Sequence, residues 1–302
     1  MSERSLSNIP ASIRQRLLNK ARTENRTFNE LLQYYAMERF LYRLSISAHA
    51  GRFILKGALM LRVWRSPETR PTMDIDMLGR TSSRDSDIIA QIEDILSVNV
   101  EPDGLVFDPH TIRTEHITED ADYEGVRVRF QGMLDTARIN MQIDIGFGDI
   151  VLPEPEIAEL PTILDSPVPR LLCYSRESAI AEKFEAMLRR RELNSRMKDF
   201  YDIWLLSRQF DFDGVLLSDA IKRTLKQRGT DLPDDIVAFT EGFATEKQVQ
   251  WIAFRKRLRL NVVPPDFSEV ASTVKSFLAP IAGSMHSGTP FTDRWTASGR
   301  WA

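Results

Sequence analysis

The spacing of hydrophobic positions changes near residue 51. Before it, apolar side chains recur at helical spacing, and Thr27 and Glu30 are spaced as a capping box at the start of the second of two predicted helices. After it, short alternating stretches predict strands. In 137–146, isoleucine and methionine occupy one face, and charged and amide side chains occupy the other. We therefore expect helices over 1–50 and an α/β core over 51–168.

A proline-rich stretch, 152–169, separates this core from a second half with helical spacing. Ser175 is predicted to cap the first helix of that half. We expect residues 169–282 to form a helical C-terminal domain. The polar segment 283–302, rich in Gly, Ser and Thr, is predicted to be a flexible tail. The expected fold class is α+β.

Composition and charge exclude several classes of protein. Of the 302 residues, 42% are hydrophobic and 27% are charged, which is typical of a globular chain and not of a disordered or fibrous one. The single cysteine, Cys173, excludes a disulfide framework and any zinc site built on paired cysteines. No apolar run approaches the ~20 residues of a membrane span. We expect a cytoplasmic protein without membrane contact, in which a metal would have oxygen ligands.

Two carboxylates separated by one residue, Asp74 and Asp76, are the sharpest chemical feature of the sequence. They share one face of a predicted strand that follows the Lys56-Gly57 turn and a polar loop. Neighbouring like charges repel unless a cation offsets them, and Mg²⁺ prefers oxygen ligands. Asp144, on the polar face of another predicted strand, is the candidate third ligand. The alternative is an ordinary surface strand with exposed carboxylates.

Carboxylates in this arrangement suit in-line attack of a hydroxyl on the α-phosphorus of a nucleoside triphosphate, with loss of pyrophosphate. Lys56 would add a positive charge near the phosphates. The backbone N–H groups of Gly57 and Ala58, at the start of a helix, would hold the triphosphate. An ordinary strand-to-helix turn is the alternative explanation for these three residues.

A second group of charged residues lies in the helical half. Lys183 is at the edge of an apolar helical stripe, and Asp199 and Asp202 share a helix face because they are three residues apart. They either face a cleft or form surface ion pairs of little energetic value. Neighbouring basic residues either contact RNA phosphates or form solvated helix faces, and Arg127 and Arg129 would instead line the polar face of the sheet. The basic clusters are Arg189, Arg190, Arg191, Arg196 and Lys198, and Arg255, Lys256, Arg257 and Arg259.

Taken in order, five segments resemble the nucleotidyltransferase toxins of abortive-infection (AbiEii/AbiGii) and related toxin–antitoxin systems. The segments are Phe53–Gly57, Arg70–Asp76, Gln142–Asp149, Ala181–Lys183 and Ser195–Asp202. The resemblance extends from roughly Ile9 to Leu260. It implies a DNA-polymerase-β-like nucleotidyltransferase core, formed by a mixed sheet with helices, and a helical C-terminal domain.

The resemblance also implies roles for individual residues. By position, Asp74 and Asp76 match the metal-binding pair, for Mg²⁺ or Mn²⁺, with NTP as co-substrate. Lys183 matches the lysine that binds the nucleotide phosphates. Asp199 matches the aspartate of the last motif, a base or an orienting group.

One position departs from the family pattern. Many polymerase-β-like enzymes have Gly-Ser where this chain has Gly57-Ala58, so the hydroxyl that would contact the terminal phosphate is missing. Lys56 and the backbone would then have to hold that phosphate.

For function, the resemblance implies a toxin of a phage-defence system that is encoded beside its antitoxin. For some relatives the acceptor is the 3′ end of tRNA, and nucleotide addition there blocks aminoacylation and halts translation. Two alternatives stay open. One is transfer of a nucleotide to a protein hydroxyl, and the other is a nucleotide-binding or antitoxin-binding module without turnover.

Overall fold

The computed structural model describes residues 8–66, 70–119, 123–258 and 263–302, and the described residues form two compact units. Unit 1 comprises the described parts of Met1–Arg65, Pro71–Gly148 and Glu156–Cys173. Unit 2 comprises those of Ser66–Arg70, Asp149–Pro155 and Tyr174–Ala302. The chain therefore passes from unit 1 to unit 2 and back twice before its helical half begins.

Unit 1 contains a sheet and the helices that pack on it. The helices are α1 (Ile9–Thr23), α2 (Phe28–Ser45), α3 (Met60–Val63) and α4 (Asp85–Leu96), with short 3₁₀ helices at Ala50–Arg52 and Gly57–Leu59. The strands are β1 (Phe53–Lys56), β2 (Ile75–Gly79), β3 (Leu105–Glu119), β4 (Tyr123–Leu134), β5 (Ala137–Phe147), β6 (Glu156–Glu159) and β7 (Arg170–Cys173).

The predicted N-terminal helices are α1 and α2. Thr27 caps α2 as the capping-box spacing predicted, since its hydroxyl oxygen accepts the N–H of Glu30 at 3.2 Å. Most of α2 is buried, including polar positions such as Gln33 and Glu38. The two helices belong to unit 1 and do not form a separate domain.

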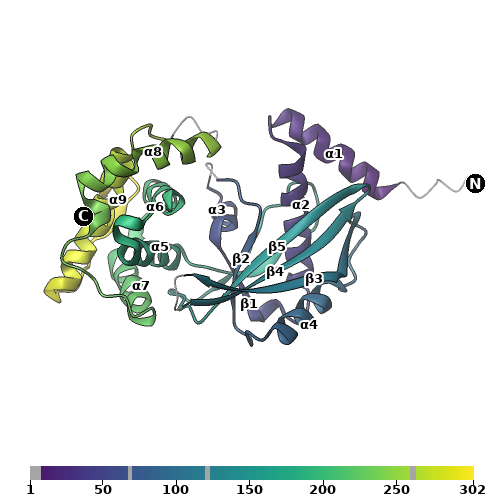
Figure 1. Ribbon diagram of the computed structural model, residues 1–302, viewed down its shortest axis with the longest axis horizontal. Coiled ribbons are helices and arrows are strands. Elements are labelled where there is room, and N and C mark those ends of the chain that lie inside the picture. Colours follow the sequence, from purple (N-terminus) through teal and green to yellow (C-terminus); the bar gives the residue numbers. More distant parts are fainter. Residues whose placement is uncertain (1–7, 67–69, 120–122, 259–262) are drawn as a thin grey trace, which may run out of the picture. The chain divides into compact units, whose positions relative to one another are not determined.

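The sheet is mixed, in agreement with the expected fold class. Within the described residues it has seven strands in the order β3-β4-β5-β2-β1-β7-β6. The pairs β2–β5 and β1–β7 are parallel, and the other pairs are antiparallel. Helices α2 and α4 contact each other and cover the same face of the sheet (Figure 1).

The alternation predicted for β5 is present. The side chains of β5 that face α2 and the core are Ile139, Met141, Ile143 and Ile145. Between them, the polar side chains point to the opposite face, because successive residues of a strand alternate. The polar face of the sheet, opposite α2 and α4, is therefore where the chemistry predicted from the sequence must lie.

Strand β3 is longer than the sequence pattern suggested. The hydrophobic spacing of the sequence predicts two separate strand segments, over 105–108 and 112–117, but they form one strand whose register with β4 shifts between Asp108 and Arg113. Pro109 lies at this shift. Proline has no N–H to donate, so it is tolerated at such an irregularity of an edge strand.

The proline-rich stretch 152–169 was predicted to be a connector between domains, but it is not a plain connector. It contains β6, which pairs with β7 at the edge of the sheet. The prolines flank these strands and do not interrupt them, and four residues are too few to show a clear alternation. Cys173, at the end of β7, is buried, and burial raises the pKa of its thiol to about 12.

Unit 2 is mainly helical, as expected. Its helices are α5 (Arg176–Arg190), α6 (Met197–Gln209), α7 (Gly214–Gln227), α8 (Glu241–Leu258) and α9 (Phe267–Ser287), with 3₁₀ helices at Arg191–Leu193 and Val237–Phe239. Ser175 caps α5 by accepting the N–H of Ser178 at 3.1 Å. In the described part of the chain, no helix is both long and apolar enough to cross a membrane.

The expectation of a flexible tail over 283–302 is wrong. Helix α9 extends to Ser287, and β9 (Arg294–Thr296) pairs with both β8 (Phe212–Asp213) and β10 (Arg300–Trp301). Trp295 is 1% exposed, and its indole N–H donates to the carbonyl of Ser207 at 2.6 Å. The polar composition of this segment concealed its buried aromatic anchors.

Candidate active site

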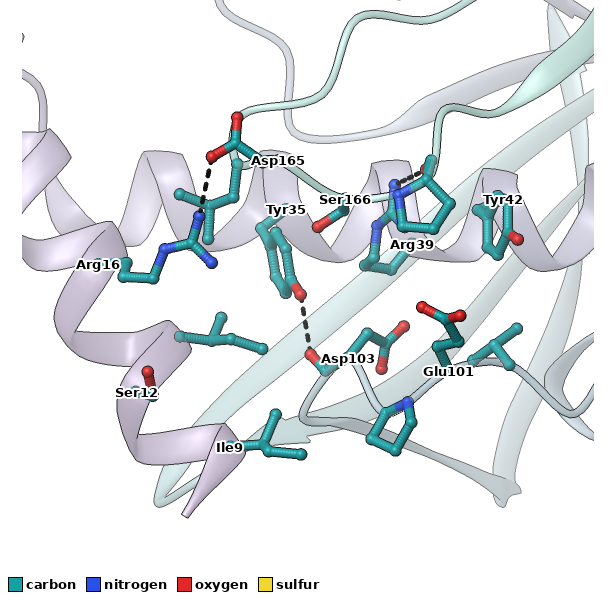
Figure 2. A pocket seen from close by; sticks show the side chains of 15 residues that line it. Ile9, Ser12, Arg16, Tyr35, Arg39, Tyr42, Glu101, Asp103, Asp165 and Ser166 are labelled. Atoms are coloured by element: carbon teal, nitrogen blue, oxygen red, sulfur yellow. Dashed lines mark hydrogen bonds and ion pairs between the residues drawn. The ribbon is translucent and has the colours of Figure 1, made fainter. Parts of the chain in front are cut away.

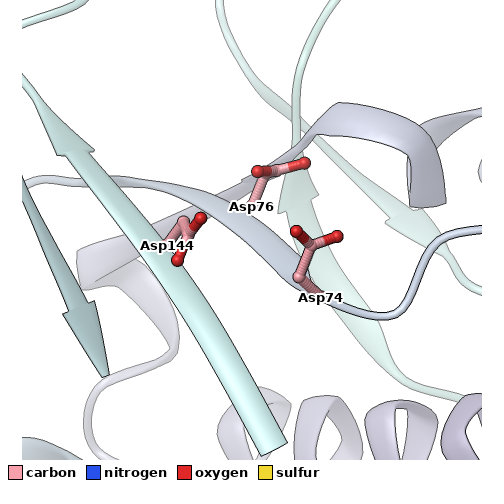
Figure 3. A group of neighbouring side chains, drawn as sticks. All are labelled: Asp74, Asp76 and Asp144. Carbon is pink, nitrogen blue, oxygen red and sulfur yellow. The ribbon is translucent and has the colours of Figure 1, made fainter. Parts of the chain in front are cut away.

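Three carboxylates of unit 1 lie together on the polar face of the sheet. Asp76 of β2 and Asp144 of β5 are register partners on neighbouring parallel strands, and Asp74 directly precedes β2. Among the described residues, one carboxylate oxygen from each lies within 4.8 Å of the others, and all three side chains are half-buried (Figure 3). A set of oxygen donors this close suits a hard divalent cation. The structure thus brings together the three residues that the sequence grouped.

The loop residues that directly precede β2 are fixed by hydrogen bonds with side chains of α2 and of the loop itself. The hydroxyl of Thr72 donates to Asp74 Oδ1 at 2.5 Å, and the Thr72 N–H donates to the hydroxyl of Tyr34 at 3.1 Å. The buried amide of Gln33 donates to the carbonyl of Met73 and to a carbonyl of β5, both at 3.1 Å. These bonds fix the backbone on both sides of the carboxylate group, so Asp74 is oriented before any ligand arrives.

A row of charged residues crosses the polar face of the sheet through this group. The strand registers pair Lys56 of β1 with Asp76, Asp144 with Arg127 of β4, and Arg127 with Glu115 of β3. Since Asp76 also pairs with Asp144, the order across five adjacent strands is Lys, Asp, Asp, Arg, Glu. The two aspartates at the centre are thus flanked by one basic residue on each side.

Arg127 binds Asp144 through both carboxylate oxygens. Its Nε donates to Oδ1 at 2.8 Å and its Nη2 to Oδ2 at 2.7 Å. The hydrogen bonds that Arg127 donates to Asp144 raise the pKa of its guanidinium, although burial acts in the opposite direction. The sequence placed Arg127 on the polar face, but it gave no signal for this pairing.

Gly57 is fixed by its backbone conformation and by the space around it. Its φ is +73°, a conformation that L side chains rarely adopt, and a Cβ here would overlap the Asp76 carboxylate. Gly57–Leu59 form a 3₁₀ turn that leads into the short helix α3, and Ala58 is buried. The turn predicted after Lys56 is therefore present, and it is packed directly against one of the three carboxylates.

In unit 2, Lys183 of α5 faces two carboxylates of α6. Its Nζ lies 3.3 Å from Asp199 Oδ1 and 2.9 Å from Asp202 Oδ2. Asp199 and Asp202 are 1% and 3% exposed, so their contacts with Lys183 are buried. The alternative of surface ion pairs is therefore wrong. Burial acts to lower the pKa of the Lys183 ammonium, but Asp202 and Asp199 outweigh it and raise the pKa above its ordinary value. Lys183 is thus held in its charged form.

Two arginines complete this buried network. Arg70 binds Asp202 through both oxygens, at 2.9 and 3.1 Å, and Arg196 Nε lies 2.7 Å from Asp199 Oδ2. Burial would raise the pKa of Asp202, but Arg70 and Lys183 lower it to about 2. In this part of the described chain, the cations of Arg70, Lys183 and Arg196 thus contact the carboxylates of Asp199 and Asp202. The Arg70–Asp202 pair was not predicted, although Arg70 is the first residue of the motif that leads to Asp74.

The basic residues proposed to contact RNA do not form a uniformly exposed patch. The exposed members of the first cluster are Arg191 and Lys198, and the half-buried members are Arg189, Arg190 and Arg196. Arg189 lies 3.2 Å from the buried Glu185, and Arg196 pairs with Asp199. In the second cluster, Arg259 lies outside the described residues.

Asp149 is the last residue of the motif segment that contains Asp144, but its side chain lies in a different environment. It belongs to unit 2, where its Oδ1 accepts a hydrogen bond from Arg228 Nη2 at 2.8 Å. Arg228 also pairs with the buried Glu185 at 2.8 Å. Of the two aspartates in this segment, Asp144 is therefore the one that joins Asp74 and Asp76.

Comparison with known proteins gives one family. The family model described as nucleotidyl transferase AbiEii toxin, type IV toxin–antitoxin system, matches residues 39–273. No curated protein matches the chain. Two solved structures from H. pylori are similar to this chain. One, described provisionally as a nucleotidyltransferase, has 12% identity, covers 86% of this chain and 98% of its own, and gives a TM-score of 0.47. The other, JHP933, has 13% identity, covers 85% and 94%, and gives 0.47.

Proposed function

The chain belongs to the AbiEii nucleotidyltransferase toxins of type IV toxin–antitoxin systems, and from this premise we propose that it transfers nucleotides from NTP to the 3′ end of an RNA, namely tRNA. The family gives the enzyme class and implies an antitoxin partner. The observation that carries the proposal is the group formed by Asp74, Asp76 and Asp144. The products of the proposed reaction would be tRNAs that cannot be aminoacylated, so translation would stop in the cytoplasm of a phage-infected cell.

The three carboxylates would hold Mg²⁺, or Mn²⁺. Their oxygen-only donor set and mutual distances fit such ions. When bound, the cation would neutralise triphosphate charge and polarise the α-phosphate. Thr72 keeps Asp74 oriented by its hydrogen bond, and Gly57 leaves the space that the Asp76 carboxylate needs. The protein's own contribution at this group is therefore to hold the ligands in position before the substrate binds.

Lys56, Gly57 and Ala58 would bind the triphosphate beside the carboxylates. Lys56 is the register partner of Asp76, which supports a position for its charge next to the phosphates. The backbone N–H groups of Gly57 and Ala58 would supply donors in place of the missing hydroxyl. We extend the same role to Lys183, whose ammonium is kept charged by its two carboxylate partners.

For Asp199 we propose an orienting role. Its two oxygens face Lys183 at 3.3 Å and Arg196 at 2.7 Å, so both are occupied by cationic partners. A carboxylate held in this way is better suited to fix the Lys183 ammonium than to remove a proton from the attacking hydroxyl. For the RNA, Arg191 and Lys198 are the exposed residues of the first basic cluster that we expect to contact phosphates.

Incubation of the protein with each α-³²P-labelled NTP, Mg²⁺, total RNA and total protein tests the proposal. We expect label in RNA of tRNA size, and none with Asp74→Asn or Asp76→Asn. Asp165→Asn is the matched control, because Asp165 is an exposed carboxylate of unit 1 whose ion-pair contact, with Arg16 at 3.4 Å, lies away from the carboxylate group. Label in protein alone would support transfer to a protein hydroxyl. Nucleotide binding without any incorporation would support a module without turnover.

A further inference from the structure

The pocket of about 280 Å³ beside α1 and α2 is lined by side chains that already donate hydrogen bonds to backbone carbonyls of the pocket. Tyr35 donates to the carbonyl of Asp103 and Arg39 to that of Pro167 (Figure 2). The polar face of the sheet carries a stronger observation. The three carboxylates of the candidate metal site are not equivalent. Asp74 is held by one hydrogen bond from a neutral hydroxyl, whereas both oxygens of Asp144 are bound by a guanidinium.

The pairing of Arg127 with Asp144 is built into the sheet. The two residues are opposite each other in the β4–β5 register, and their bonds of 2.8 and 2.7 Å have the lengths of charge-assisted hydrogen bonds. Arg129, two residues along the same strand and on the same face, makes no such contact with the carboxylate group. It pairs with Glu115 at 2.9 Å and donates to Gln142 at 3.2 Å.

A divalent cation and a guanidinium compete for the same carboxylate. A cation bound to Asp144 must share an oxygen with Arg127 or displace it, and it must also approach the positive charge of the guanidinium. Glu115, the register partner of Arg127 on β3, offers a second carboxylate to a displaced guanidinium. Since Arg129 already pairs with Glu115 at 2.9 Å, a displaced Arg127 would share that carboxylate with Arg129.

We propose that Arg127 is a positioning residue that balances the negative charge of Asp144 in the absence of a metal ion. By occupying both oxygens of Asp144, Arg127 weakens the binding of a divalent cation by this carboxylate. The cation then depends mainly on Asp74 and Asp76 until the anionic triphosphate contributes its own oxygens. This inference rests on the proposed metal-dependent function. It assigns Arg127 a regulatory effect on the third ligand, in addition to holding that ligand in place.

Mn²⁺ titration of the full chain without nucleotide, followed by the electron paramagnetic resonance signal of free Mn²⁺, tests this assignment. We expect Arg127→Gln to bind Mn²⁺ about tenfold more tightly, because both oxygens of Asp144 are released from the guanidinium and become available to the cation. Arg129→Gln is the matched control and should change the affinity by less than about twofold, since Arg129 is the register partner of Gln142, not of Asp144, and its charge is paired with Glu115 at 2.9 Å. Circular dichroism and thermal melts establish that each variant is folded.

The double variant separates the proposed role from a purely structural one. In an Asp144→Asn background, Arg127→Gln should change the Mn²⁺ affinity by less than about twofold, because the two effects act through one carboxylate. Unchanged or weaker binding in folded Arg127→Gln would overturn the proposal and leave Arg127 as a structural support of Asp144. If Arg127→Gln does not fold, Arg127→Lys replaces it. Lysine keeps the positive charge but cannot contact both carboxylate oxygens in the way that a guanidinium does, so we expect a Mn²⁺ affinity between those of wild type and Arg127→Gln. A Mn²⁺ affinity equal to that of wild type would overturn the proposal.

The same titration distinguishes this inference from the proposed function. Loss of Mn²⁺ binding in Asp74→Asn, together with no effect of Arg127→Gln, would overturn only the role of Arg127. Mn²⁺ binding that does not depend on Asp74 or Asp76 would overturn the metal site itself.

Discussion

At the scale of the single residue, Gly57 links the sequence most directly to the proposed chemistry. Its positive φ and the adjacent Asp76 carboxylate each exclude a side chain, so two independent constraints act on one position. The sequence indicated a turn at this glycine for phosphate binding. The structure adds a second reason for glycine, which is the close approach of a carboxylate.

We predict that Gly57→Ala reduces nucleotide transfer by roughly 10² or more, because the new methyl group must push Asp76 out of its position. Mn²⁺ affinity should fall with it, and the strained backbone should cost on the order of 1 kcal/mol in stability. Gly51→Ala is the control, since a methyl group at Gly51 would meet no atom within 4 Å and its φ is not positive. Near-normal transfer in Gly57→Ala would show that the position of Asp76 does not limit the reaction.

Glu38 is a buried carboxyl away from the proposed chemistry. Its Oε2 accepts the N–H of Ile163 at 2.8 Å, and its side chain is inaccessible to solvent. Burial raises its pKa to about 7, although the bond from Ile163 and the charges of Arg39 and Arg62 oppose this effect. The folded protein therefore keeps a proton on Glu38 at pH values where the unfolded chain has lost it.

We predict that wild type loses stability relative to Glu38→Gln as the pH rises. Glu38 stabilises the folded state fully below the unfolded pKa of 4.5, and this contribution is lost as the pH rises through about 7. The difference in unfolding free energy between the two proteins should change by roughly 3 kcal/mol from pH 4.5 to pH 8. Urea unfolding at a series of pH values measures it. A difference that does not vary with pH would mean that Glu38 is ionised throughout.

The sequence could predict single residues where one strand or helix sets their direction. Asp144 was identified because the alternation of its strand puts it on the polar face. The bond from Arg127 to Asp144 depends on the register between two strands, and the bond from Arg70 to Asp202 joins residues 132 positions apart. Neither register nor tertiary packing can be derived from local periodicity.

At the scale of secondary structure, long periodic segments were predicted well, whereas the short strands of the connector and of the C-terminal segment were not. The helices α1, α2 and α5 and the strand β5 have enough residues for their period to show. Strands β6 to β10 have two to four residues each, and a strand of that length has no measurable alternation. Their pairing is set by tertiary contacts, which explains why the connector and the tail were misjudged.

We predict that Trp295→Ala destabilises unit 2 by about 3–5 kcal/mol, because it removes a buried aromatic side chain and its hydrogen bond. Trp295 packs against Phe277 and Trp301, with ring centroids 4.8 and 5.3 Å away. Urea unfolding followed by tryptophan fluorescence and circular dichroism measures the change. Arg294→Ala, at an exposed position of the same strand, should have little effect. Equal stability of the two variants would contradict the packing of the C-terminal segment on unit 2.

At the scale of the whole molecule, the fold class and the order of the motifs could be predicted, but the division of the chain could not. The chain was expected to divide once, after the core. It divides at several points instead, because residues 149–155 belong to unit 2 while β6 and β7 return to the sheet of unit 1. Arg70 belongs to unit 2, whereas the Asp74 that follows in the same motif belongs to unit 1. A contiguous motif thus supplies charged residues to both units.

Membership of a toxin–antitoxin family predicts how the protein acts in a cell. We expect its expression to arrest growth, and expression of Asp76→Asn, with one carboxylate fewer, to permit growth at equal protein levels. If tRNA is the acceptor, the arrested cells should contain tRNAs extended at the 3′ end, detectable by sequencing of tRNA termini, before protein synthesis stops. Co-expression of the protein encoded beside it should restore growth. Arrest by Asp76→Asn as well would mean that toxicity does not come from nucleotide transfer, and failure of every neighbouring reading frame to restore growth would count against a dedicated antitoxin.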